Sequence, residues 1–196
     1  MFKHISLCTY PYCSKSSLSL IYSAPNIYVG VETISRTRVA PRKINVDAVK
    51  DPKLLVDEVS KLLYMDEREA RGFIGGTTIT AYRRVHEIIA SVLDRTIALR
   101  GADVNTFQKM VHELLVELSK ALVLVKYQRA RGQLSDGLAT NLESLIGITT
   151  GILKDLLTKP SSTQDYSSIV ENVVNTLTRA RTLLDALATL VYTYGR

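Results

Sequence analysis

Apolar residues recur every three or four positions from about residue 47 to the end of the chain. Each helical residue advances about 100° around the axis, so this spacing gathers the apolar side chains on one side of a helix. The pattern predicts an all-α, compact bundle whose stripes face one core. Three of the stripes are Leu54, Leu55, Val59, Leu62 and Leu63; Tyr82, Val85, Ile89 and Val92; and Phe107, Val111, Leu114, Leu118, Leu122 and Val125.

Capping side chains and terminating glycines divide this region into about five helices. A short charged turn, from Asp66 to Arg71, separates the first helix from the second. The connections are short, which favours antiparallel neighbours. The helices are predicted to begin at Asp51-Pro52, Thr77 or Thr78, Asn105 or Thr106, Ser135 and Ser162, and to end near Leu63, Arg100, Arg131, Thr158 and the C-terminus.

Residues 1–45 lack this helical period. They hold both cysteines and a serine cluster, and Ile27, Val29 and Val31 alternate with smaller or polar-tipped residues as in a short strand. Three interpretations stay open: a disordered arm, a small hairpin, and sequence that precedes the biological start. The domain prediction is therefore an irregular N-terminal arm at 1–45 and a helical bundle domain at 46–196.

The net charge of +6 is unevenly distributed. Residues 1–45 hold six Lys or Arg and one Glu, a net charge of +5, and residues 68–131 hold eleven basic and six acidic residues, again +5. A local basic excess favours a polyanionic partner such as RNA. The alternative is a solvated surface that keeps the protein in solution.

The sequence offers no motif for catalysis or metal binding. No His-Glu-x-x-His motif and no Gly-rich phosphate loop is present, and His4, Cys8 and Cys13 lack a fourth zinc ligand. We therefore expect no catalytic residue, no metal and no cofactor. If the protein were a toxin-like RNase, His86 or His112 would be its catalytic candidate.

The chain has no apolar run of the roughly 20 residues that a membrane helix needs, and no secretory signal pattern. We expect a cytoplasmic protein with no membrane partner.

A candidate binding face lies opposite the apolar stripe of the 105–131 helix. Lys109, Lys120, Tyr127 and Arg131 fall within about 40° of one another there. Val116 and Leu124 share this outward face. Basic residues also crowd the end of this helix and the outer faces of the preceding one. The candidate RNA-binding residues are Arg83, Arg84, Arg95, Lys109, Lys120, Lys126, Tyr127, Arg129 and Arg131, of which Arg83 is also spaced to pair with Glu87.

Three stretches carry a family likeness. The first, Thr78-Ile79-Thr80-Ala81-Tyr82-Arg83-Arg84, is similar to a Thr-rich cap followed by Gln-Ile-Arg. The second, Tyr127-Gln128-Arg129-Ala130-Arg131, is similar to an Ala-Tyr-x-x-Gly-Arg helix ending. The third, Leu190-Val191-Tyr192-Thr193-Tyr194, is similar to a terminal Glu-x-Ile-Val-Ala-Tyr. In this order and spacing the chain resembles the small helical subunit of type III-A CRISPR interference complexes, the Csm small-subunit family. Arg83, Tyr127, Arg131 and Tyr194 match, whereas Ala81, Ala130 and Thr189 replace the family's Gln, Gly and Glu.

This resemblance implies a non-catalytic subunit of an antiviral ribonucleoprotein. It would pack against further copies of itself, beside the backbone subunits and the large subunit. It would line the groove where guide and target RNA pair, and it would contact phosphates without sequence specificity, because base pairing supplies the specificity. The sequence leaves type III-A and type III-B open. The main alternative is a helical protein–protein adaptor with no nucleic-acid role.

Overall fold

The computed structural model describes residues 42–158 and 163–196, without the side chains of 163–165. Several sequence predictions lie outside the described residues. They are the alternating segment at Ile27 to Val31, the cluster of His4, Cys8 and Cys13, and the helix start at Ser162.

The described residues form six α-helices and one 3₁₀ helix, so the all-α prediction is confirmed and the predicted number of about five helices is roughly consistent with the structure. Within these residues no helix combines the length and hydropathy that a membrane span requires. The elements are η1 (Val46–Lys50), α1 (Pro52–Leu63), α2 (Glu67–Ile74), α3 (Ile79–Ala98), α4 (Val104–Ala130), α5 (Asp136–Thr158) and α6 (Thr163–Tyr194).

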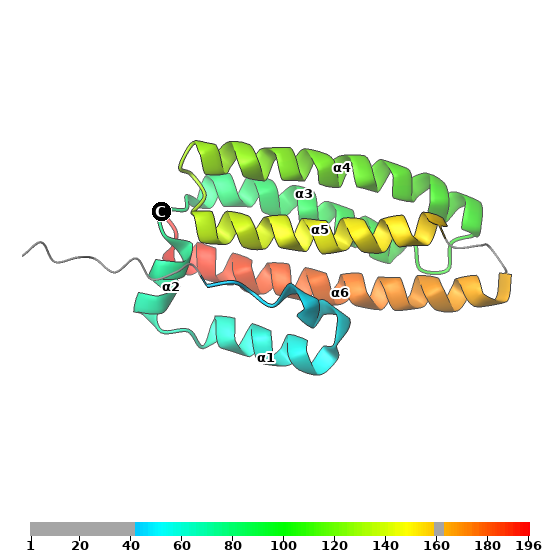
Figure 1. Cartoon of the computed structure of the whole chain (residues 1–196), viewed down its shortest axis with the longest axis horizontal. Coiled ribbons are helices and arrows are strands. Elements are labelled where there is room, and N and C mark those ends of the chain that lie inside the picture. Colours follow the sequence, from blue (N-terminus) through cyan, green and yellow to red (C-terminus); the bar gives the residue numbers. More distant parts are fainter. Residues whose placement is uncertain (1–41, 159–162) are drawn as a thin grey trace, which may run out of the picture. The chain divides into compact units, whose positions relative to one another are not determined.

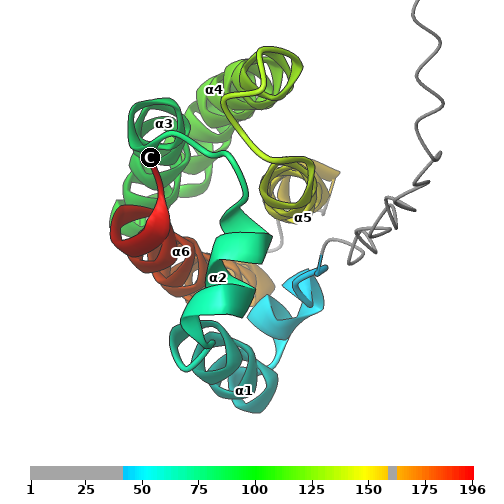
Figure 2. The same cartoon turned by 90° about the vertical axis from the view of Figure 1, so that its left-hand side faces the viewer.

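The four long helices α3 to α6 run side by side, with consecutive helices antiparallel (Figure 1). Helix α3 packs against α4 and α6, and α4 packs against α5. Helix α1 lies along α6, and α2 contacts α5 and α6 at one end of the bundle (Figure 2). Elements η1, α1 and α2 therefore pack on the side of the bundle that α5 and α6 form, away from the outer surface of α3 and α4.

The extra helix is α2, where the sequence pattern predicted a charged turn. Asp66 caps it by accepting a hydrogen bond from the Glu69 backbone N–H at 2.8 Å. Its charged residues face solvent, whereas Ala70, Phe73 and Ile74 are buried. The three apolar positions follow the helical three-to-four spacing, but eight residues give too short a pattern for the period to stand out among the charges.

Three predicted helix starts are confirmed. Each capping side chain accepts a hydrogen bond from a backbone N–H in the first helical turn, which satisfies one of the otherwise unpaired donors there. The pairs are Asp51 with Lys53 at 2.8 Å, Thr78 with Ala81 at 3.3 Å, and Ser135 with Leu138 at 3.2 Å.

Helix α4 starts two residues earlier than predicted. Asp103 is its cap, and one carboxylate oxygen accepts from the backbone N–H groups of Asn105 and Thr106, both at 3.0 Å. The Thr106 hydroxyl donates to the other oxygen at 2.6 Å. These bonds, the Thr106 hydroxyl bond first, lower the pKa of Asp103. The carboxylate is the stronger acceptor, so Asp103 takes the position that the sequence assigned to Asn105 or Thr106.

The predicted stripes on α3 and α4 form the core. Every member is fully buried except Leu122, which is half-buried. The first stripe is only partly correct, because Leu54 and Leu63 on α1 are exposed while Leu55 and Leu62 are buried. Helix α1 lies at the edge of the bundle and packs on α6 alone among the long helices, so only one narrow side of it is covered.

Residues 42–45, assigned to the arm by the sequence pattern, belong to the bundle. Ile44 is 6% exposed, and its backbone N–H donates to the side-chain oxygen of Asn141 at 2.9 Å. The Asn141 amide in turn donates to the Arg42 carbonyl at 3.1 Å, and the Arg42 side chain pairs with Glu69 at 2.7 Å. One isolated apolar residue has no period, so its burial could not be read from the sequence.

We therefore expect a deletion of residues 1–45 to be less stable than a deletion of residues 1–41. The longer deletion removes the Ile44 side chain from the core and both hydrogen-bond partners of the buried Asn141. Its free energy of unfolding should be lower by about 2–5 kcal/mol. Urea titration followed by circular dichroism measures the difference. Equal midpoints would show that residues 42–45 do not pack on the bundle in solution.

Candidate nucleic-acid interface on α3 and α4

Four of the predicted residues lie on the exposed side of α4. Lys109, Lys120, Tyr127 and Arg131 all face solvent, opposite the buried stripe of the same helix. The three cations are eleven residues apart, which corresponds to steps of about 16 Å along the axis. Lys109 and Lys120 have no hydrogen-bond or ion-pair partner among the described residues. Their charge is therefore not neutralised within the chain.

Arg131 and Tyr127 contact each other at the end of α4. The Arg131 guanidinium donates a hydrogen bond to the Tyr127 hydroxyl at 3.2 Å and lies 5.4 Å from the ring centroid. No carboxylate pairs with Arg131 within the described part of the chain. The pair presents an aromatic ring and a positive charge together on the surface.

Helix α3 contributes Arg84, which is exposed and has no partner among the residues that the structure describes. Arg84 and Lys120 line the same open groove of about 580 Å³ between α3 and α4. Leu124, predicted to face outward, is half-buried in this groove, whereas Val116 is 56% exposed as predicted. The groove thus places cations from two helices over a partly apolar floor.

Two other predicted cations, both on α3, are paired. Arg83 bonds to Glu87 one turn later at 2.7 Å, and this carboxylate raises the pKa of Arg83. Arg95 reaches across to α4, where it pairs with Glu117 at 2.7 Å and with Glu113 at 3.7 Å. Arg95 therefore links α3 to α4, and its charge is already paired with carboxylates of the protein.

The remaining two, Lys126 and Arg129, point to α5. Arg129 pairs with Asp136 at 2.8 Å and with Glu143 at 3.8 Å, and Lys126 lies 3.8 Å from Glu143. The sequence places both near Arg131 at the end of the helix, but it cannot show which neighbouring helix supplies acidic groups. Within residues 42–158 and 163–196, the nine predicted residues thus divide into Tyr127, four paired cations, and four cations without a carboxylate partner: Arg84, Lys109, Lys120 and Arg131. We call these last four the unpaired cations.

The two candidate histidines lie in different surroundings. The His86 ring nitrogen is 3.4 Å from a carboxylate oxygen of Asp185, and Arg181 bridges Asp185 to Asp94. His112 is exposed on α4 with no partner in the described ranges. Sequence reasoning missed the His86 network because α3 and α6 are separated by about a hundred residues in the chain.

Tyr82, which the sequence pattern assigns to the core, is fully buried. Its hydroxyl donates to the Leu184 carbonyl at 3.2 Å, and its ring meets Tyr192 edge-on with centroids 6.4 Å apart. Burial is the main cause that raises the pKa of Tyr82. Tyr127 is therefore the aromatic residue of the predicted face that a ligand can reach.

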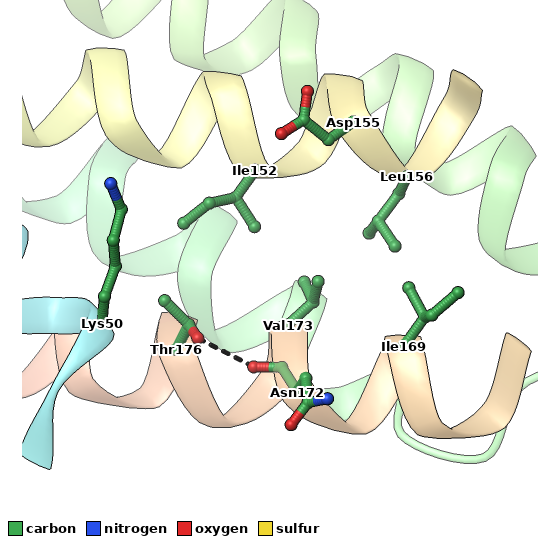
Figure 3. Close-up of a pocket in the computed structure, with 8 residues that line it drawn as sticks. All are labelled: Lys50, Ile152, Asp155, Leu156, Ile169, Asn172, Val173 and Thr176. Carbon is green, nitrogen blue, oxygen red and sulfur yellow. Dashed lines mark hydrogen bonds between the residues drawn. The ribbon is translucent and has the colours of Figure 1, made fainter. Parts of the chain in front are cut away.

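A hollow of about 240 Å³ lies elsewhere, between α5 and α6. Figure 3 shows Ile152 and Leu156 from α5 facing Ile169 and Val173 from α6. Lys50 at its rim is already hydrogen-bonded to Asp47 at 2.8 Å. The hollow is smaller than the roughly 300–1,000 Å³ of small-molecule sites. Within residues 42–158 and 163–196, no three His, Cys, Asp or Glu side chains form a metal site.

Reversing charge on the α4 face should not change stability. In the triple variant Lys109→Glu, Lys120→Glu, Arg131→Glu, each side chain lies outside the core. The free energy of unfolding should change by no more than about 0.5 kcal/mol per substitution. Leu118→Ala, on the buried side of the same helix, should cost about 2–5 kcal/mol. Urea titration compares the two variants, and a large loss in the triple variant would place these residues inside the fold.

Compared with known protein families, with curated proteins and with solved structures, the chain matches none.

Proposed function

We propose that this protein is a non-catalytic subunit of a ribonucleoprotein complex that binds RNA phosphates along the outer face of α3 and α4. The observation that carries the proposal is the row of Lys109, Lys120 and Arg131 along α4, joined by Arg84 from α3. None of these cations has a carboxylate partner in the described part of the chain.

The unpaired cations suit a phosphate backbone for two physical reasons. A phosphate that binds them displaces counterions rather than a protein carboxylate, so no internal ion pair is lost. The row extends about 33 Å along one helix, which follows a polymer better than a compact ligand. No base-edge recognition is needed for such contacts, so binding would not depend on sequence.

The type of complex is proposed from the three stretches that resemble the Csm small-subunit family. Residues just beyond the second and third stretches bond to the first stretch at one end of the bundle. The Ile79 N–H donates to the Arg196 carbonyl at 2.9 Å, and the Thr78 N–H donates to the Gln133 carbonyl, just past α4, at 2.9 Å. We propose a type III CRISPR effector in the cytoplasm, where the chain would contact guide and target RNA, the backbone and large subunits, and further copies of itself in antiviral defence.

A second candidate function is a protein–protein adaptor. The observation that favours it is on α1, where Val56, Leu63 and Tyr64 are exposed, Tyr64 by 88%. Exposed apolar groups of this kind are typical of protein contacts. Helix α1 packs on α6 rather than on α4, so a protein bound at α1 would leave the α3–α4 face open to RNA. A protein that is only an adaptor would bind no RNA at any salt concentration.

Fluorescence anisotropy with a labelled single-stranded RNA tests the proposal. The full chain should bind at low salt, and its affinity should fall steeply as salt rises. The triple variant Lys109→Glu, Lys120→Glu, Arg131→Glu should bind about 10- to 100-fold more weakly. Its slope of log affinity against log salt should be shallower by about 2, because each lost phosphate contact removes about 0.7. The RNA should remain uncut on a denaturing gel.

The matched control is Lys43→Glu, Lys53→Glu, Arg68→Glu, which makes the same change in net charge. These three residues are exposed and lie before α3, and their side chains have no partner in the described part of the chain. The control should keep nearly all the affinity. Equal losses in the two triple variants would show that net charge, not the α4 face, drives binding. No binding by the full chain at low salt would favour the adaptor, and cleavage would favour the enzyme.

A further inference from the structure

One continuous strip on α4 combines apolar and cationic side chains. Lys120, Val123, Tyr127 and Arg131 follow one another at intervals of three or four residues, so each lies about one turn beyond the last on the same side of the helix. Val123 is 68% exposed and Tyr127 is 53% exposed. We call these four residues the α4 platform: an apolar centre with an unpaired cation at each end, about 16 Å apart.

We infer that the α4 platform binds single-stranded RNA in preference to duplex, with one base stacked on the Tyr127 ring and phosphates at Lys120 and Arg131. This inference rests on the proposed RNA-binding function. It adds the form of RNA that the site selects, which in the proposed complex would be unpaired stretches of RNA rather than the guide–target duplex, and the residue that selects it.

The exposed apolar centre is what discriminates between the two forms. A duplex presents phosphates and sugars outward and keeps the faces of its bases inside the stack. Against that surface Val123 and Tyr127 would lose water without gaining an apolar partner. A single strand can turn a base toward the protein, and every base has a face that stacks on an aromatic ring regardless of sequence. The preference for single strands is therefore compatible with binding that does not read sequence.

The Tyr127 side chain is already restricted in conformation before a base binds. Its hydroxyl accepts the Arg131 hydrogen bond at 3.2 Å, which limits the rotation of both side chains. The next residue, Gln128, is buried, and its carbonyl accepts bonds from the Gln133 N–H at 2.9 Å and the Leu134 N–H at 3.3 Å. These contacts fix the end of α4, so little conformational entropy is lost when a base docks.

A helix of a protein partner would pack poorly against the α4 platform. A helix–helix seam needs apolar side chains at successive turns, and a lysine within the seam lowers its stability. Here Lys120 interrupts the apolar positions between Val116 and Val123. Phosphates at both ends of the platform make use of the cations that a helix seam would have to exclude.

The test compares three ligands of equal length by anisotropy, using the full-length protein at low salt. They are a labelled single-stranded RNA, the same RNA annealed as a blunt duplex, and a ribose-phosphate strand without bases. The single strand should bind most tightly. Tyr127→Ala should weaken binding of the single strand by about 5- to 100-fold, the range for loss of one base stack, and should leave the duplex and the abasic strand nearly unchanged.

Two control variants separate stacking from other effects. Tyr127→Phe keeps the ring and should retain most of the affinity, although it loses the hydroxyl that Arg131 bonds. Tyr64→Ala removes a tyrosine at the end of α1 that is even more exposed than Tyr127, and it should change nothing. Circular dichroism melting checks that each variant is folded.

The outcomes separate the inference from the proposed function. Binding of the duplex as tight as that of the single strand, or an equal loss of abasic-strand affinity in Tyr127→Ala, would overturn the platform while leaving phosphate binding intact. No binding of any ligand would overturn both. A change in sedimentation coefficient of the free protein on Tyr127→Ala would assign the strip to a protein contact instead.

Discussion

The position of the candidate site depends on a hydrogen-bonded junction centred on Thr77. This residue is fully buried between α2 and α3, and its hydroxyl donates to the Ile74 carbonyl at 2.7 Å and accepts from the Ser135 N–H at 3.0 Å. Its own carbonyl accepts from the Arg196 N–H at 3.1 Å. One side chain and its backbone thus tie together the end of α2, the start of α5 and the C-terminus. Because the Thr77 side chain is buried, leaving its hydroxyl without these partners would be costly.

The junction explains why the end of α4 can serve as a binding surface. The α4–α5 turn is anchored at Thr77 through Ser135, so Tyr127 and Arg131 project from a fixed helix end rather than from a mobile loop. Gly195, one residue before the C-terminus, has no side chain because a Cβ there would lie 2.5 Å from the Val191 carbonyl oxygen. The backbone at Gly195 therefore packs closely, next to the Arg196 N–H that bonds to Thr77.

Charge pairing decides which basic residues are available to a partner. Arg95 pairs with Glu117, and Arg129 pairs with Asp136. These ion pairs link α3 to α4 and α4 to α5. Exposed pairs of this kind are individually worth only about 0–1 kcal/mol, yet they lower the local positive potential that steers a polyanion. The unpaired cations lie along α4 and, through Arg84, on the neighbouring side of α3, which restricts the expected RNA path to one face.

The sequence by itself determined the helical class, most helix starts and the two central stripes, because these depend on local caps and on a period repeated over many turns. It also placed Lys109, Lys120, Tyr127 and Arg131 on one outward face, since a long straight helix fixes that geometry. The tertiary structure decided what no period encodes: the short helix α2, the burial of Ile44 against Asn141, and the acidic partners of four predicted cations. Each of these depends on residues brought together from distant parts of the chain, so the helix wheel could give the direction of a side chain but not its neighbour.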